Sequence, residues 1–150
     1  MAANSKREQI IVSVKEDLET IPSIATVKRS LPTLKDLENF AVTQFPVIAM
    51  VAGLPVPRPH VVGRRTAGKD VFISDLNISL YCYFQDNVEP DTQLSNILDD
   101  LWATLYADPT RGELAIGTTL KPEFYRGYWE PFYAFRVDVV IQYSHKTGGI

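Results

Sequence analysis

The chain has 150 residues, of which 45% are hydrophobic and 22% are charged, and its formal net charge is −3. This composition supports an ordinary hydrophobic core and excludes a chain that is disordered throughout. The slightly acidic balance excludes a strongly basic nucleic-acid coat. The single cysteine, Cys82, excludes an internal disulfide framework and a multi-cysteine metal cluster. The length suits one compact domain, over residues 1–150.

The first half of the chain predicts two helices and two strands. A capping-box pattern at Ser5 precedes apolar residues at helical spacing and predicts a helix over residues 5–20. Alternation over residues 24–31 predicts a short strand, and residues 33–44 predict a short helix. A continuous apolar run over residues 47–51 has the length of a strand that is buried on both faces.

The second half predicts one more main helix and three strands. Residues 53–70 are rich in proline, glycine and basic side chains, which predicts an exposed excursion. Alternation over residues 71–85 predicts the clearest strand, and a helix over residues 91–106 follows it. A short strand over residues 114–120 and then a loop lead to the last strand, over residues 132–143.

Together these elements predict an α+β domain, within the wider α/β class. Its sheet is expected to be mixed but mainly antiparallel, with about four to five strands packed by two main helices. A long proline-rich basic loop completes it. The longest apolar run, over residues 47–54, is far too short to span a bilayer, and the polar first residues do not fit a secretory signal. We therefore expect no membrane contact and synthesis in a reducing cytoplasm.

Four basic residues of the excursion form the first candidate contact site. They lie within a short stretch, so they can form a positive patch despite the net negative charge. A solvated loop, an acidic protein surface and DNA phosphates are three environments open to them. The stretch also fits the start of a phosphate-binding loop, but Asp70 occupies the place of the required hydroxyl, so we reject nucleotide binding. The four residues are Arg58, Arg64, Arg65 and Lys69.

The aromatic stretch before the last strand, and that strand itself, supply further candidate contacts. Tyr125, Tyr128 and Trp129 lie where aromatic residues are dense, which is typical of contact surfaces but equally fits packing over a sheet edge. Arg136 and Asp138 are two residues apart on one face of the last strand. They either pair with each other or with a neighbouring subunit.

Catalytic chemistry has little material in this chain. Cys82 lies on the apolar face of its strand and is expected to be an inert structural thiol. His60 and His145 have no partner at metal-ligand spacing. We therefore predict no catalytic residue, no cofactor, no metal and no enzymatic activity.

Three stretches carry a family resemblance. The first is the N-terminal helix that leads to Ile21-Pro22-Ser23-Ile24, and the second is the proline-led hydrophobic strand over residues 45–51. The third runs from the strand over residues 76–84 through the helix over residues 91–106 to the strand over residues 135–143. In this order of elements the chain resembles the tail terminator proteins of tailed bacteriophages, also called tail completion or head–tail joining proteins.

The resemblance implies a structural virion protein without enzymatic chemistry. Such a protein forms a homo-oligomeric ring, usually a hexamer, that caps the tail tube, ends its polymerisation and presents a surface to the neck or head completion protein. DNA passes through the ring without sequence-specific contact. The implied location is the virion tail or neck, after assembly in the host cytoplasm. The alternative within the virion is another neck or head–tail connector, or a tail tube subunit. Outside it, a small enzyme and a DNA-binding module that uses residues 58–69 stay open.

Overall fold

The computed structural model describes residues 5–40, 44–57, 71–85, 89–112, 114–129 and 132–146. The fold is α+β, as the sequence predicts. No helix in these ranges is both long enough and apolar enough to cross a membrane. In chain order, the elements are α1 (Lys6–Glu19), β1 (Thr26–Lys28), α2 (Leu34–Asn39), β2 (Val47–Ala52), β3 (Val56–Pro57), β4 (Val71–Phe84), α3 (Pro90–Ala107), β5 (Gly117–Trp129) and β6 (Phe132–Lys146).

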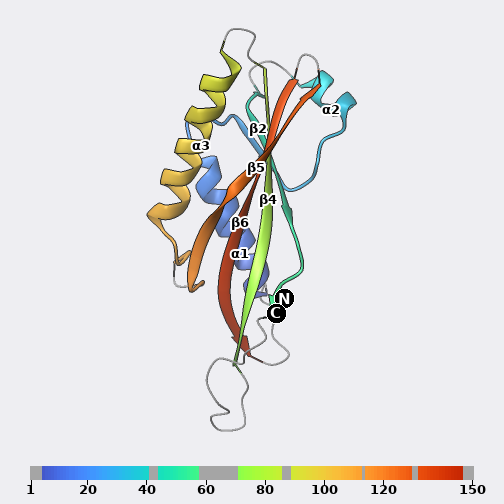
Figure 1. The fold of residues 1–150 in the computed structure, drawn as a ribbon. Helices are drawn as coiled ribbons and strands as arrows, with labels where there is room; N and C mark the ends of the chain where they lie inside the picture. Colours follow the sequence, from blue (N-terminus) through green and yellow to red (C-terminus); the bar gives the residue numbers. More distant parts are fainter. Residues whose placement is uncertain are drawn as a thin grey trace.

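The strands form one mixed, mainly antiparallel sheet in the order β1-β2-β4-β6-β5, with β3 paired to β4 outside this path (Figure 1). Only β1 and β2 pair in parallel. At the centre, the whole of β4 pairs with β6, from Val71 opposite Lys146 to Phe84 opposite Tyr133. The sixth strand, β3, lies inside the stretch predicted as an excursion, and residues 58–70 lie outside the described residues.

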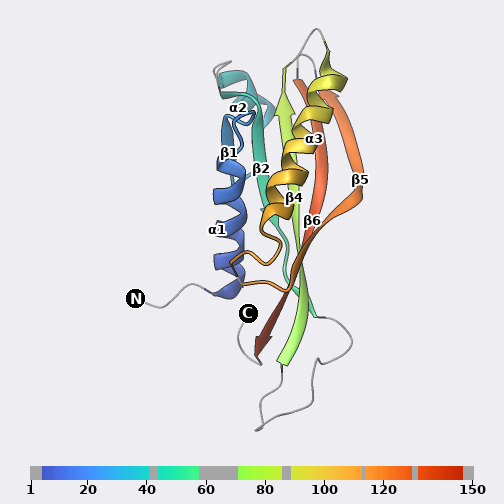
Figure 2. The same ribbon diagram turned by 90° about the vertical axis from the view of Figure 1, so that its left-hand side faces the viewer.

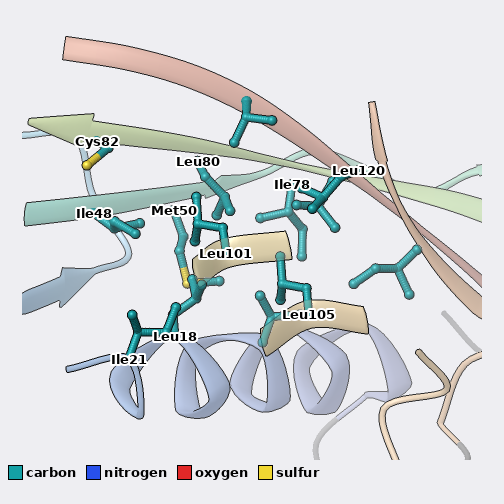
Figure 3. Packing of buried hydrophobic residues seen from close by; sticks show 14 of the residues in the cluster. Leu18, Ile21, Ile48, Met50, Ile78, Leu80, Cys82, Leu101, Leu105 and Leu120 are labelled. Carbon is teal, nitrogen blue, oxygen red and sulfur yellow. The ribbon is translucent and has the colours of Figure 1, made fainter. Parts of the chain in front are cut away.

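The main core lies between the sheet and two helices. α1 and α3 cross the same face of the sheet (Figure 2), and their apolar stripes meet the alternate side chains of the strands (Figure 3). The capping pattern at the start of α1 is confirmed, because the Ser5 hydroxyl accepts a hydrogen bond from the backbone amide of Glu8 at 3.1 Å. Core residues from the helices include Ile10, Val14, Leu18, Ile97, Leu101 and Leu105, and those from the strands include Ile48, Met50, Ile78, Leu80, Val139 and Ile141.

The short helix α2 lies on the opposite face of the sheet from α1 and α3 (Figure 1). Leu37 of α2 is buried there in a second, smaller cluster with Ala49, Tyr83 and Phe132. Among the described residues no other helix packs on this side, so we call the remainder of it the helix-free face. Strand alternation and the β4–β6 register place on it, among others, Asn77, Ser79, Tyr81, Arg136, Asp138 and Val140.

The prediction of a loop after residue 120 is wrong, because β5 continues from Gly117 to Trp129. Pro122 cannot donate a ladder hydrogen bond, which is why the sequence suggested a loop. β5 is an edge strand, however, and its register against β6 shifts between Leu120 and Phe124. An edge position and an irregular register are both settings in which a strand accommodates a proline.

The connection from α3 to β5 buries a cation. Arg111 has a φ of 51°, and its side chain is fully buried. Its guanidinium forms an ion pair with Asp17 of α1, and its Nη2 donates to the carbonyl oxygen of Leu105 at 2.6 Å. The C-terminal end of a helix is electronegative, so one buried cation joins α1 to the end of α3.

Removing the counter-ion of Arg111 is expected to cost more than removing the cation itself. Asp17→Ala leaves a buried guanidinium without its carboxylate, so we expect the free energy of unfolding to fall by about 3 kcal/mol. Arg111→Met removes the charge and keeps most of the packed volume, so its cost is expected to be smaller. Urea unfolding of both variants measures the difference, and the reverse order would contradict this account.

Candidate functional site

A pocket of about 400 Å³ lies where the start of α3 meets the β5–β6 hairpin. The strands alternate in and out, so Phe84 and Tyr133 both face the helix side of the sheet and line this pocket together. Leu94 of α3 and Tyr128 of β5 add further apolar surface. We call it the aromatic pocket, and it lies where the end of β4 is beside the first turn of α3.

Ring contacts position the aromatic side chains of the pocket. Phe84 and Tyr133 stack with their ring centroids 5.8 Å apart and 20° between the ring planes. The ring of Tyr128 lies 4.6 Å from that of Tyr133, and it is 54% exposed to solvent. Aromatic side chains contribute much of the binding energy at protein interfaces, because they bury a large area at a small cost in conformational entropy. The pocket is therefore suited to hold an apolar group.

An ion pair lies at the rim of the aromatic pocket. Nη1 of Arg126 in β5 donates to Oδ1 of Asp91 in α3 at 2.9 Å. Both side chains are more than half exposed, so solvent screens the pair and its contribution to stability is small. It does place one charge of each sign at the edge of an apolar pocket, where a partner with charges of its own would meet them.

The helix-free face carries a second polar arrangement, centred on Arg136 of β6. Its Nε and Nη2 donate to the two carboxylate oxygens of Asp138 at 3.1 and 3.0 Å. The guanidinium also lies over the ring of Tyr81 in β4, 5.8 Å from the ring centroid. Arg136 and Asp138 share a strand face at a spacing of two residues, so the pair forms within the chain.

Asp138 is buried in this arrangement at 8% relative exposure. Burial by itself raises the pKa of its carboxyl, because a buried carboxylate loses solvation. The hydrogen bonds from Arg136 and Ser79, together with the charges of Arg136 and Lys121, outweigh that effect and hold the pKa of Asp138 below its ordinary value. The carboxylate therefore stays ionised and paired at neutral pH.

The structure divides the candidate contact residues between two faces. Tyr128 lines the aromatic pocket on the helix side, whereas Arg136 and Asp138 lie on the helix-free face and pair with each other. Tyr125 and Trp129 belong to β5, and their side chains lie outside the described part of the chain. The four basic residues of the predicted excursion also lie outside the described residues, namely Arg58, Arg64, Arg65 and Lys69.

The described residues include one thiol, that of Cys82. Cys82 is fully buried in the main core, where burial raises the pKa of its thiol far above neutrality and so keeps it protonated. It is an inert core residue, as the alternation of its strand predicts. Within the described ranges, no three His, Cys, Asp or Glu side chains are grouped so that they could hold a metal ion.

Sequence reasoning missed two parts of these surfaces. It left Arg126 and Asp91 unpaired because they are 35 residues apart, and nothing in the local pattern of either residue signals the other. It also assigned Phe84 and Leu94 to the apolar side of their elements without a pocket between them. An alternating strand and an amphipathic helix predict an inward face, but not whether the facing side chains fill the space.

The two surfaces have a common physical character. Each combines aromatic side chains with an arginine–aspartate ion pair. Aromatic residues and arginine are enriched on surfaces that contact other proteins. No protein-family model matches the chain, and a search of curated proteins also finds no match.

The stability contributed by Asp138 is expected to depend on pH below about 4, near the ordinary pKa of an aspartate. The pKa of Asp138 is lower in the folded protein than in the unfolded chain, so the ionised carboxylate stabilises the fold at any pH above the unfolded-state pKa. This stabilisation is lost as the pH falls through the folded-state pKa. The free energy of unfolding of the Asp138→Asn variant should therefore be about 1.5 kcal/mol lower than that of the unchanged protein at pH 7. This deficit should shrink below about pH 4. Urea unfolding over a pH series measures the deficit, and a constant value down to pH 2.5 would contradict the prediction.

Proposed function

We propose that this chain is a structural protein of a tailed-phage virion, of the tail terminator type. In this role identical copies form a ring, hexameric in such proteins, that caps the tail tube and ends its polymerisation. The ring joins the tail to the neck or head completion protein, and DNA passes through it without sequence-specific contact. The protein then belongs to the tail or neck of the virion and works without catalysis or a cofactor.

The order of the elements carries this proposal. The stretches that resemble the family include α1, the proline-led β2, the central β4, the helix α3 and the final strand β6. All the strands among them belong to one sheet, and both helices pack on its same face. The resemblance is therefore one of several elements in a fixed order and does not depend on any single motif.

The character of the exposed surfaces supports the same role. A ring that ends a polymer must bind a tube subunit on one side and a different protein on the other, which requires distinct contact surfaces on each copy. The aromatic pocket lies on the helix side, and the Arg136–Asp138 pair lies on the helix-free face. Two separate surfaces on opposite faces suit such a two-sided adaptor.

The outer edge of the sheet favours contact through side chains over growth by strand addition. β5 has the longest open edge among the described strands, and it carries Pro122 and a register shift after Leu120. Both features obstruct pairing with a further strand. The other edge, β1, has only three residues. A subunit that polymerises by strand addition would need a longer regular edge, so these edges favour a cap over a tube subunit.

A tube-capping assay tests the proposal. Cognate tail tube subunits are polymerised with and without the protein, and electron microscopy measures tube length and the position of the bound protein. We expect the protein at one end of each tube and shorter tubes at higher protein concentration, because a bound ring blocks further addition. Tubes of unchanged length with bare ends would contradict the proposal. Open-ended polymers of this protein alone would identify a tube subunit, and binding to head-side parts alone would identify another connector.

The basic residues of the stretch 58–69 are expected to serve contacts and not the fold. Replacing Arg58, Arg64, Arg65 and Lys69 by glutamine should leave the melting temperature within about 2 °C of that of the unchanged protein, because loops of this composition lie outside the core. Binding to the partner or to duplex DNA should weaken. Thermal unfolding monitored by circular dichroism checks the first point, and loss of the cooperative transition would show that these residues support the fold.

A further inference from the structure

Two strands in turn form the open edge of the sheet on the β5 side. β5 begins at Gly117, which lies opposite Gln142, so the end of β6 beyond that point is itself the outermost strand. Backbone N–H and C=O groups that point out of such an edge can pair with a strand of another molecule. What happens to these groups therefore decides whether the sheet can grow.

A tyrosine of α3 holds an outward amide of β5. The backbone amide of Leu120 donates to the hydroxyl of Tyr106 at 2.9 Å, so it points away from β6. The ring of Tyr106 packs against that of Trp102, with the ring centroids 5.0 Å apart. Two residues further along β5, Pro122 has no amide hydrogen at all. A strand that approached this part of β5 would find no amide donor at either residue.

A lysine of α1 holds an outward carbonyl of β6. The amide of Ile116 donates to the carbonyl oxygen of Gln142 at 2.7 Å, so this carbonyl points toward the β5 side. Alternate residues of an antiparallel strand direct their carbonyls to the same side, so the carbonyl of Ser144 points there as well, beyond the start of β5. Nζ of Lys6 donates to it at 2.7 Å. The ammonium group thus takes the place of the donor that an added strand would supply.

The next residue of α1 does the same on the other side of the sheet. β1 covers β2 only as far as Ala49, so the end of β2 is also an edge. The amide of Gly53 donates to the carbonyl oxygen of Asn77 in β4 at 2.9 Å. A trans peptide unit directs its C=O away from its N–H, so the carbonyl of Ala52 points out of the sheet. Nη2 of Arg7 donates to this carbonyl oxygen at 3.4 Å and to that of Gly53 at 3.0 Å.

The position of these two cations does not favour the helix that carries them. The first turn of a helix has a positive partial charge, which disfavours lysine and arginine there. Lys6 and Arg7 are the first two residues of α1, and both are half-buried. Their charges lie on carbonyl oxygens of β6 and of the end of β2. One helical turn therefore holds outward carbonyls on both sides of the sheet.

We infer that Lys6, Arg7 and Tyr106 are edge caps, which close the sheet to strand addition by a second copy of this chain. Lysine at a sheet edge is one of the means by which proteins prevent such pairing. Two further described strands offer only short edges, since β1 has three residues and β3 has two. The edge caps act within one copy and do not depend on a ring, so they go beyond the proposed function.

Hydrogen exchange of single amides tests the tyrosine edge cap directly. Tyr106→Phe removes the hydroxyl and keeps the ring, so we expect the amide of Leu120 to exchange about fivefold faster. The amide of Gly53 is the matched control, because its acceptor is a backbone carbonyl of β4 and its exchange rate should not change. Nuclear magnetic resonance measures both rates. An unchanged rate at Leu120 overturns the role of Tyr106.

A triple variant tests whether the edge caps close the sheet. It combines Lys6→Met, Arg7→Met and Tyr106→Phe, which remove the capping groups and keep most of the side-chain volume. The matched control makes the same changes of charge and chemistry away from these contacts, on α1, α2 and the central strand β4, namely Lys15→Met, Lys35→Met and Tyr81→Phe. We expect the variant without edge caps to self-associate at a concentration at least about tenfold lower than the control.

Analytical ultracentrifugation measures this association, and infrared spectroscopy of the amide band detects strands added between molecules. Circular dichroism shows whether each variant is folded. The single Tyr106→Phe variant enters the same assay, so it decides the outcome if the triple variant does not fold. Equal association of the variant and its control overturns the inference, and so does association without added strand content.

The outcomes separate the edge caps from the proposed function. Tail tubes of unchanged length at every concentration of the unchanged protein would count against the function and leave the edge caps intact. A variant without edge caps that associates no more than its control, while the unchanged protein still shortens tubes, would overturn the edge caps alone.

Discussion

The continuous pairing of β4 with β6 is the constraint on which the rest of this structure depends. All 14 residues of β4 have a partner in β6, so the two strands keep one register over their shared length. Because alternate residues point to opposite faces, this single register assigns every side chain of both strands to the helix side or to the helix-free face. A slip of β6 by one residue would move Val139 out of the core and Arg136 into it.

The same register creates the two candidate contact surfaces. On the helix side it brings Phe84 opposite Tyr133 at the end of the sheet, beside the first turn of α3, and so builds the aromatic pocket. On the other face it sets Tyr81 opposite Arg136 and Ser79 opposite Asp138. Both surfaces therefore depend on the pairing of the two central strands.

Three arginine–aspartate ion pairs neutralise charge within the described part of the molecule. Arg136 and Asp138 neutralise each other on an open sheet face, Arg126 and Asp91 do so at the rim of the pocket, and Arg111 and Asp17 do so inside the fold. Only the last pair includes a fully buried cation, so it supports the packing of α1 against α3, whereas the other two pairs shape surfaces. A face whose charges are already paired can pack against a protein without leaving a buried unpaired charge.

Local pattern determined the two main helices and the strands β2, β4 and β6, because helical spacing, alternation and apolar runs act between neighbours in sequence and the core follows them. It also placed Arg136 and Asp138 on one strand face and predicted an inert Cys82. Tertiary structure alone decided that β5 continues past Pro122. A strand tolerates a proline at the edge of a sheet, and the edge position of β5 depends on how the whole sheet is assembled. Tertiary structure also decided three other features, namely the aromatic pocket, the Arg126–Asp91 pair and the burial of Arg111. Each of them joins residues far apart in the chain, and their contact depends on how the helices pack on the sheet.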